Sequence, residues 1–167
     1  MGLTRQYHQA TLRRERLRVW ARGMRRQAEL RALAKRTDRI KGRDILLFCT
    51  LRNERVRLPY FLDYYRRLGV AHFLFVDNGS TDGGAEYLAA QPDVSVWTTQ
   101  ASYKRSRFGM DWLNGLLHRF ARGHWALVVD ADEFLVYPHM ETRPLAALTE
   151  WLDSCNQRSF GTILLDM

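Results

Sequence analysis

The sequence predicts an α/β protein in which helices cover a largely parallel central sheet. Short apolar runs, typical of buried strands, alternate with segments whose apolar residues recur at helical spacing. Polar residues directly follow several of these runs, as they do at the carboxyl ends of parallel strands, where ligands bind. The length of 167 residues is that of one domain.

The predicted strands are short and mostly apolar. The runs at 45–48 and 73–76 are uniformly apolar, as in strands buried on both faces, and the run at 125–129 is apolar enough for another central strand. Residues 94–98 alternate as a further strand. Two more short strands are expected, at 134–137 and 160–165.

The predicted helices carry apolar stripes with spacings of three and four residues. They cover 58–68, 85–89, 112–120 and 145–152. Gly69 is expected to end the first of these helices, and Thr81 or Asp82 to cap the second. Trp112 and Trp125 lie in a helical stripe and in a buried run, so both are expected in the core.

The composition excludes several classes of protein. Hydrophobic residues make up 46% of the chain, aromatic residues 12% and charged residues 26%, which excludes a disordered chain, a collagen and a coiled coil. No apolar run approaches the roughly 20 residues of a membrane-spanning helix, and the early arginines leave no apolar segment for a signal peptide. Cys49 and Cys155 fit buried free thiols better than a disulfide scaffold or a zinc site. We therefore expect a cytoplasmic protein.

The net charge of +8 is concentrated in one part of the chain. Residues 1–43 contain fourteen Lys and Arg against three acidic residues, a net charge of +11, whereas residues 44–167 contain twelve against fifteen, a net charge of −3. We interpret residues 1–43 as a basic N-terminal arm and residues 44–167 as the globular domain.

The basic arm is predicted to be helical over residues 11–36, which contain no proline and a single glycine. A narrow apolar stripe runs along this segment and includes Leu17, Trp20 and Met24. Three roles stay open: a solvated helix packed on its own domain, a helix in peripheral contact with the anionic inner face of a membrane, and an arm that binds RNA or DNA. Because Trp20 lies among arginines, membrane contact is favoured over nucleic acid.

Residues capable of binding or catalysis follow three of the predicted strands. Because the carboxyl ends of parallel strands lie at the same edge of a sheet, these residues are expected to converge. They are Arg52, Asn53 and Glu54 after the first strand, Asp77 and Asn78 after the second, and Asp130 and Asp132 after the run at 125–129.

Asp130 and Asp132 are two residues apart, so their carboxylates point to the same side of an extended backbone. Such a pair suits Mg²⁺ or Mn²⁺, which prefers oxygen ligands and shares them with substrate phosphates. The alternative is that both acids merely end the strand. A phosphatase of the haloacid-dehalogenase type also begins with two such aspartates, but it needs Thr or Val where this chain has Phe134.

Residues 77–83 form a polar turn with several groups able to bond a base or a ribose. The Asp77 carboxylate can accept a hydrogen bond from a uracil or guanine N–H or from a ribose hydroxyl, and the glycines permit close approach of the backbone. The spacing of a dinucleotide-binding fingerprint is absent. A capped turn without a ligand is the alternative.

These motifs together resemble family-2-like glycosyltransferases of the GT-A fold, over about residues 44–137. The longer strings at 58–65 and 130–134 resemble a bacterial subgroup of that family. The segments that carry the resemblance are Arg52-Asn53-Glu54, Val76-Asp77-Asn78-Gly79-Ser80-Thr81-Asp82-Gly83, Asn114-Gly115-Leu116 and Val129-Asp130-Ala131-Asp132.

The resemblance implies a Rossmann-like sandwich and the transfer of a sugar, with inversion, from a nucleotide-diphosphate donor to an acceptor hydroxyl. It implies Mn²⁺ or Mg²⁺ as cofactor, an acceptor that is a glycan or is lipid-linked, and a setting in polysaccharide or glycolipid assembly. The residues implied in donor nucleotide binding are Arg52, Asn53, Glu54, Asp77, Asn78, Arg107 and Asp130. Asp132 is implied as a direct metal ligand, with Asp130 beside it.

Two departures from the family pattern bear on function. The family has a second acid after the second strand, where this chain has Asn78. The general base of inverting members comes from a later acidic residue in the acceptor half, which we expect to be missing here, so no catalytic base is assigned. The alternative function is therefore a non-catalytic nucleotide-binding or scaffolding module of the same fold. A nucleotidyltransferase is disfavoured, because Arg52-Asn53-Glu54 lacks the glycine-rich loop of that class.

Overall fold

A computed structural model of the protein describes residues 2–163, with side chains described from residue 11 onward. Within these residues one five-stranded sheet has the order β1-β4-β3-β2-β5. Strands β2, β3, β4 and β5 are parallel, and β1 pairs antiparallel with β4. The bounds of the strands are β1 (Arg31–Ala34), β2 (Ile45–Leu51), β3 (Val70–Asp77), β4 (Val94–Thr98) and β5 (Ala126–Val128).

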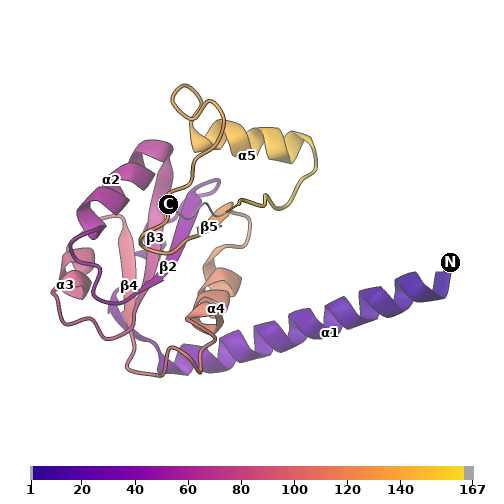
Figure 1. Ribbon diagram of the computed structural model, residues 1–167, viewed down its shortest axis with the longest axis horizontal. Helices are drawn as coiled ribbons and strands as arrows, with labels where there is room; N and C mark the ends of the chain where they lie inside the picture. Colours follow the sequence, from indigo (N-terminus) through magenta and orange to yellow (C-terminus); the bar gives the residue numbers. More distant parts are fainter. Residues whose placement is uncertain (1, 164–167) are drawn as a thin grey trace.

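Helices cover both faces of this sheet (Figure 1). Helices α2 and α3 lie on one face and α4 on the other, while α1 runs beneath α4 and α5 lies beyond β5. The protein is therefore an α/β protein with a mostly parallel sheet, compatible with a Rossmann-like arrangement. The bounds of the helices are α1 (Gly2–Arg26), α2 (Leu58–Leu68), α3 (Gly84–Ala89), α4 (Met110–Phe120) and α5 (Leu145–Ser154), with short 3₁₀ turns η1 (Gln27–Glu29) and η2 (Thr37–Arg39).

Strands β2 and β3 form the centre of the core and are buried on both faces, as predicted. Successive residues of β2 alternate between the faces: Leu47 packs in the cluster that includes α2, whereas Leu46 and Phe48 pack with α4. Trp112 is fully buried in the α4 cluster, as predicted, and Trp125 is half-buried against the other one.

Helix α2 has the predicted bounds and the predicted end. Pro59 lies in its first turn, where its missing N–H costs no hydrogen bond, and Gly69 ends it with a left-handed φ of 101°. The cap of α3 differs slightly from the prediction. Gly83 is the residue that precedes the helix, and Asp82 Oδ1 accepts a hydrogen bond from the N–H of Gly84 at 2.9 Å.

The prediction for the basic arm is wrong beyond Arg26. Helix α1 ends there, and Arg31–Ala34 is strand β1 at the edge of the sheet. The pairing of β1 with β4 outweighs the helical propensity of Arg and Ala, and the Arg36 guanidinium reinforces it by donating to the carbonyl oxygens of Val94 and Ala89. Residue 43 is therefore not a border between an arm and a separate sheet.

Three predicted strands need correction. The run at 125–129 is not central, because β5 lies at the edge of the sheet and 42% of Val128 is exposed. Residues 134–137 form no strand, and residues 160–163 form none either; residues 164 and 165 lie outside the described part. Leu135 and Tyr137 of the first segment instead join the core cluster that includes α2, whereas Phe160 and Ile163 of the second are exposed.

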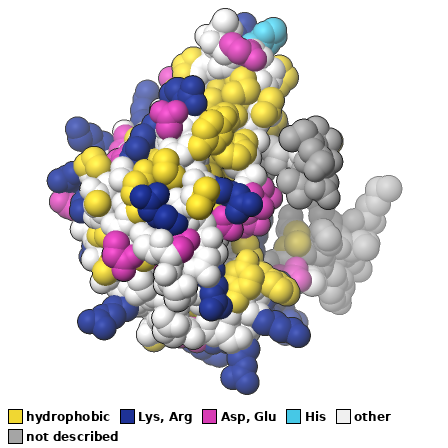
Figure 2. Space-filling model, turned by 60° about the vertical axis from the view of Figure 1, so that its left-hand side comes forward, with side chains coloured by type: hydrophobic (Ala, Val, Ile, Leu, Met, Phe, Trp, Pro, Cys, Tyr) yellow, Lys and Arg dark blue, Asp and Glu magenta, His cyan; other side chains and the backbone are white. Residues whose placement is uncertain are grey.

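The described cysteines are free thiols: Cys49 is buried, as predicted, and Cys155 is exposed. Among the described helices, none has the length and hydrophobicity to cross a membrane. Viewed from the side of α2 and α3, the surface carries a group of exposed hydrophobic side chains next to charged ones (Figure 2).

Candidate functional site

A cavity of about 370 Å³ opens where β2, β3 and β5 end, at the carboxyl edge of the sheet. Its volume lies in the range of small-molecule sites. The predicted residues that line it are Arg52, Glu54, Asn78, Asp130 and Asp132. The remaining lining residues are Thr50, Leu51, Tyr103 and Ala131. Asn53, Asp77 and Arg107 are not among the lining residues.

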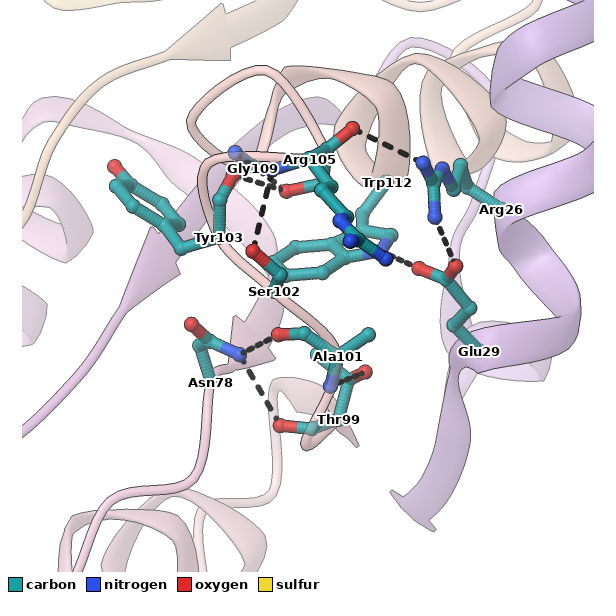
Figure 3. A network of polar contacts seen from close by, with 11 residues as sticks. Arg26, Glu29, Asn78, Thr99, Ala101, Ser102, Tyr103, Arg105, Gly109 and Trp112 are labelled. Carbon is teal, nitrogen blue, oxygen red and sulfur yellow. Dashed lines mark hydrogen bonds and ion pairs between the residues drawn. The ribbon is translucent and has the colours of Figure 1, made fainter.

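Asn78 is buried at the end of β3 and presents one group to the cavity. Its amide nitrogen donates to the carbonyl oxygens of Thr99, at 3.2 Å, and Ala101, at 3.0 Å (Figure 3). Since both carbonyls need a donor, the orientation of the amide is settled, and its oxygen is left as a hydrogen-bond acceptor. Figure 3 shows this oxygen directed away from Thr99 and Ala101.

Asp77 is the last residue of β3, next to Asn78, and is only 2% exposed. Its Oδ1 accepts hydrogen bonds from the N–H groups of Gly79, at 3.1 Å, and Ser80, at 3.0 Å, which shapes the polar turn. Its Oδ2 is buried and has no hydrogen-bond partner among the described residues. A buried carboxylate oxygen without a donor is unfavourable, so this oxygen is a ready acceptor.

Asn53 connects two loops. Its N–H donates to Ser80 Oγ at 2.8 Å, and its Oδ1 accepts from the N–H of Thr81 at 2.8 Å. Close by, the N–H of Arg55 donates to Asp82 Oδ2 at 2.8 Å. These bonds join the loop after β2 to the loop after β3, which holds the two walls of the cavity together.

Asp130 and Asp132 supply two carboxylates to the cavity from the turn after β5. Glu133 closes this turn: its carboxylate accepts from the N–H of Asp130 at 3.0 Å. Burial, and then the negative charges of Glu133 and Asp132, raise the pKa of Asp130 above its usual value. The carboxylates therefore repel one another, and a cation between them would relieve this repulsion.

Two tyrosines of α2 hold the segment that follows this acidic pair. The Tyr65 hydroxyl donates to the carbonyl oxygen of Glu133 at 3.0 Å and accepts from the N–H of Leu135 at 3.1 Å, while the Tyr64 hydroxyl donates to the carbonyl oxygen of Leu135 at 2.7 Å. Burial raises the pKa of Tyr65, which keeps it a neutral donor. The apolar stripe of α2 identified Tyr65 as a core residue but did not reveal this function.

Tyr103 enters the cavity from the loop between β4 and α4. Burial, followed by the charge of Asp130, raises the pKa of its hydroxyl, so it remains a neutral donor beside the acidic pair. The same loop packs tightly on the cavity wall, because a Cβ on Gly109 would lie 2.7 Å from Thr50 Oγ1. Sequence reasoning considered this loop only for Arg107, which instead lines the groove between α1 and α4.

The carboxylate oxygens of Asp130 and Asp132 are ligands of the kind that hard divalent cations prefer, and such cations commonly share them with phosphate groups. Among the described residues no group of three or more His, Cys, Asp and Glu is arranged to hold a metal ion. Asp130 and Asp132 nevertheless provide the one or two carboxylates with which proteins commonly bind Mg²⁺, the remaining ligands being water and substrate phosphates.

No model of a known protein family matches the chain, and no curated protein matches it either. The fold and the cavity define an α/β protein with an acidic, partly enclosed site at the carboxyl edge of a mostly parallel sheet. A functional proposal therefore depends on the chemistry of this site.

Proposed function

We propose that the protein is a metal-dependent glycosyltransferase of the GT-A fold, similar to family 2, or the donor-binding portion of such an enzyme. It would transfer a sugar from a nucleotide-diphosphate donor to an acceptor hydroxyl, with inversion at the anomeric carbon. The observation that carries this proposal is that Asp130, Asp132 and Asn78, from separate strand ends, line one cavity together with Arg52.

The nucleoside would lie against the end of β3. The Asn78 side chain offers only its oxygen, since both amide hydrogens are bonded to carbonyl groups. Asp77 does not line the cavity and is only 2% exposed, so we assign the base contact to Asn78 rather than to Asp77. An acceptor in this position can take a hydrogen bond from the ring N–H of uracil or guanine, so we expect a uridine or guanosine diphosphate donor.

The diphosphate would lie at the acidic end of the cavity. Asp132 and Asp130 would hold Mn²⁺ or Mg²⁺, which, when bound, neutralises a diphosphate and stabilises it as a leaving group. Arg52 is exposed and lines the cavity, and its guanidinium suits a phosphate oxygen. We assign the diphosphate contact to Arg52 in place of Arg107, because Arg107 lines a different groove.

The acceptor would approach over exposed aromatic side chains beside the acidic pair. Tyr60 is 59% exposed, and its ring lies 5.3 Å from that of Phe134, which follows Asp132 by two residues. Figure 2 shows hydrophobic side chains next to acidic ones on the side of the molecule that carries α2. Exposed apolar patches of this kind mark binding surfaces, and aromatic faces suit the apolar faces of sugar rings.

A non-catalytic donor-binding module is the second candidate. The third carboxylate of the cavity, Glu54, is paired with Arg57 and is therefore a poor general base. A module that binds the donor without transferring the sugar would retain the cavity and lack the base.

Calorimetric titration of UDP and GDP, with and without Mn²⁺, tests the donor site. We expect one nucleotide to bind only with the metal, Asp132→Asn to abolish this binding, and Asp63→Asn to preserve it. Asp63 is the matched control, because it is an exposed aspartate on α2 outside the cavity. Metal-independent binding that Asp132→Asn leaves unchanged would refute the metal site, and absence of binding by the folded protein would refute the donor site.

Turnover then separates the two candidates. A transferase is expected to release UDP or GDP from its sugar nucleotide when an acceptor is supplied, and this release should require Mn²⁺ and Asp132. Metal-dependent binding without any release of nucleotide would favour the non-catalytic module.

A further inference from the structure

Helix α1 carries a surface that its own domain leaves uncovered. The C-terminal part of the helix is firmly docked: a Cβ on Gly23 would lie 2.9 Å from the backbone nitrogen of Gly115 in α4, and Gln27, just after the helix, donates to the carbonyl oxygen of Trp112 at 3.0 Å. The rest of the helix extends away from the sheet (Figure 1). A helix with one docked end and one extended end presents its free sides to a partner.

One free side is apolar. Leu17 is 56% exposed, Trp20 45% and Met24 43%. Their spacing of three and four residues places them on one side of the helix, and the rings of Trp20 and His118 of α4 form a T-shaped pair with a centroid distance of 5.8 Å. These three side chains form a continuous apolar strip that leads from the helix to the domain.

The same helix is strongly cationic. It contains eight arginines and a single acidic residue, Glu15. Among the residues whose side chains the structure describes, Arg22 and Arg26 pair with acids, whereas Arg13, Arg14, Arg16, Arg18 and Arg25 do not. The charge of these arginines is therefore available to an external anion.

Cationic and apolar side chains meet in the groove between α1 and α4. This groove has a volume of about 600 Å³, and its lining includes Arg16, Arg18 and Arg107 together with Leu12 and Trp20. Guanidinium groups beside half-exposed apolar side chains match the boundary between lipid phosphates and acyl chains.

We propose that α1, with the groove it forms against α4, is a peripheral binding surface for anionic lipid. The arginines would contact headgroup phosphates, while Leu17, Trp20 and Met24 would enter the boundary between headgroups and acyl chains. A nucleic acid would also attract the arginines, but contacts with its phosphates would leave the apolar strip exposed to water. The strip therefore favours the lipid surface.

The surface is coupled to the candidate site. Arg26 donates to the carbonyl oxygen of Arg105 at 3.1 Å, and Trp112 Nε1 donates to the Glu29 carboxylate at 2.8 Å (Figure 3). The first of these bonds joins the end of α1 to the loop that carries Tyr103 into the cavity, and the second joins η1 to α4. A membrane bound by α1 would therefore set the orientation of the cavity relative to the lipid surface. This inference does not depend on the proposed transfer reaction.

Co-sedimentation of the full chain with vesicles tests the proposal without any nucleotide. We expect binding at low salt to vesicles of phosphatidylglycerol and phosphatidylcholine, and none to phosphatidylcholine alone. Arg16→Gln with Arg18→Gln is expected to lower the partition coefficient about five-fold per arginine. Leu17→Ser with Trp20→Ser is expected to lower it about ten-fold or more.

Matched controls lie outside α1. Arg122→Gln with Arg158→Gln removes two exposed arginines, and Val56→Ser removes an exposed apolar side chain; we expect neither to change the partition coefficient. Circular dichroism checks that all variants remain folded. Failure to bind anionic vesicles would overturn the proposal, as would equal binding to both kinds of vesicle.

A parallel titration of short RNA and DNA duplexes decides between the two anionic partners. The lipid proposal would be overturned, and α1 assigned to nucleic acid, if the protein bound duplexes but not vesicles. In that case the arginine variants should weaken duplex binding, and Leu17→Ser with Trp20→Ser should leave it unchanged.

Discussion

The backbone N–H of Asn53 donates to Ser80 Oγ over 2.8 Å, and this bond joins the loops that follow β2 and β3. Asn53 returns a second bond by accepting from the N–H of Thr81. Residues that the sequence suggested as nucleotide ligands thus hold the walls of the cavity to each other. Motif residues around the candidate site can therefore contribute by fixing the loops that form its walls.

Replacing Asn53 by alanine is expected to lower the free energy of unfolding by about 1–3 kcal/mol. The change leaves the N–H of Thr81 without its acceptor, and it places alanine at a left-handed φ of 58°. Urea denaturation measures the effect. Asn156→Ala is the control, because Asn156 has a similar φ of 55° and its side chain makes no hydrogen bond in the described structure. An equal loss of unfolding free energy in both variants would show that the hydrogen bond between Asn53 and Thr81 does not contribute to stability.

Replacing Tyr65 by phenylalanine is expected to weaken both stability and metal-dependent nucleotide binding. The change removes one hydroxyl that serves the carbonyl of Glu133 and the N–H of Leu135, and leaves both groups unsatisfied beside the acidic turn. We expect a loss of about 1–3 kcal/mol of unfolding free energy. Tyr60→Phe, which removes an exposed hydroxyl, should change neither quantity. If the nucleotide affinity of Tyr65→Phe were unchanged, the turn held by Tyr65 would not contribute to nucleotide binding.

The elements predicted best from the sequence are those whose own pattern of apolar residues and glycines indicates their burial and their ends. The uniform apolar runs of β2 and β3 are buried on both faces, and the stripe of α2 ends at a glycine with positive φ. Such patterns lie within a single segment of the chain, so the sequence of that segment is enough to predict the element. The edge position of β5 is not local, because an apolar run does not reveal how many neighbours a strand has.

Strand β1 shows why other elements escape prediction. Arg31–Ala34 consists of good helix formers, and its strand conformation comes from pairing with β4, more than sixty residues later in the chain. The site shows the same contrast. The convergence of Asn78, Asp130 and Asp132 follows from the rule for parallel strand ends. The contribution of Tyr103 depends on the path of a loop, for which the sequence carries no comparable rule.

Replacing Gly109 by alanine is expected to disturb the cavity wall. Gly109 has a φ of 80°, and a Cβ would lie 2.7 Å from Thr50 Oγ1. Gly123→Ala is the matched control, because Gly123 has a φ of 83° and no atom within 4 Å of the added Cβ. We expect the control to lose about 1 kcal/mol of unfolding free energy from backbone strain, and Gly109→Ala to lose more and to bind nucleotide less tightly. An equal loss of unfolding free energy in the two variants would show that the loop can shift to accommodate the added methyl group without further cost.

Replacing Tyr60 by alanine tests the acceptor surface of the proposed transferase. The ring is exposed and lies outside the cavity lining, so nucleotide affinity should stay unchanged while the KM for the acceptor rises several-fold, with on the order of 1 kcal/mol lost per aromatic contact. Steady-state kinetics with varied acceptor measure this. Tyr87→Ala, on α3, is the control for removing a tyrosine elsewhere. A fall in kcat with unchanged acceptor KM would contradict the assignment.

His72 is expected to make stability depend on pH. It is buried on β3, and its Nε2 lies 2.9 Å from Ser95 Oγ, which also accepts a hydrogen bond from the N–H of Arg36. In this buried environment the charged imidazolium form is poorly solvated compared with its state in water. Burial accordingly lowers the pKa of His72 below its usual 6.5.

Because the unfolded chain takes up a proton at His72 at higher pH than the folded chain, the stabilisation is complete above pH 6.5 and falls as the pH decreases below it. The slope from this single group is at most about 1.4 kcal/mol per pH unit. Urea denaturation between about pH 5 and 7, where carboxylates contribute little, measures it. His72→Asn should flatten this dependence, whereas His118→Asn, at an exposed position, should preserve it. An unchanged slope in His72→Asn would show that another group controls stability in this range.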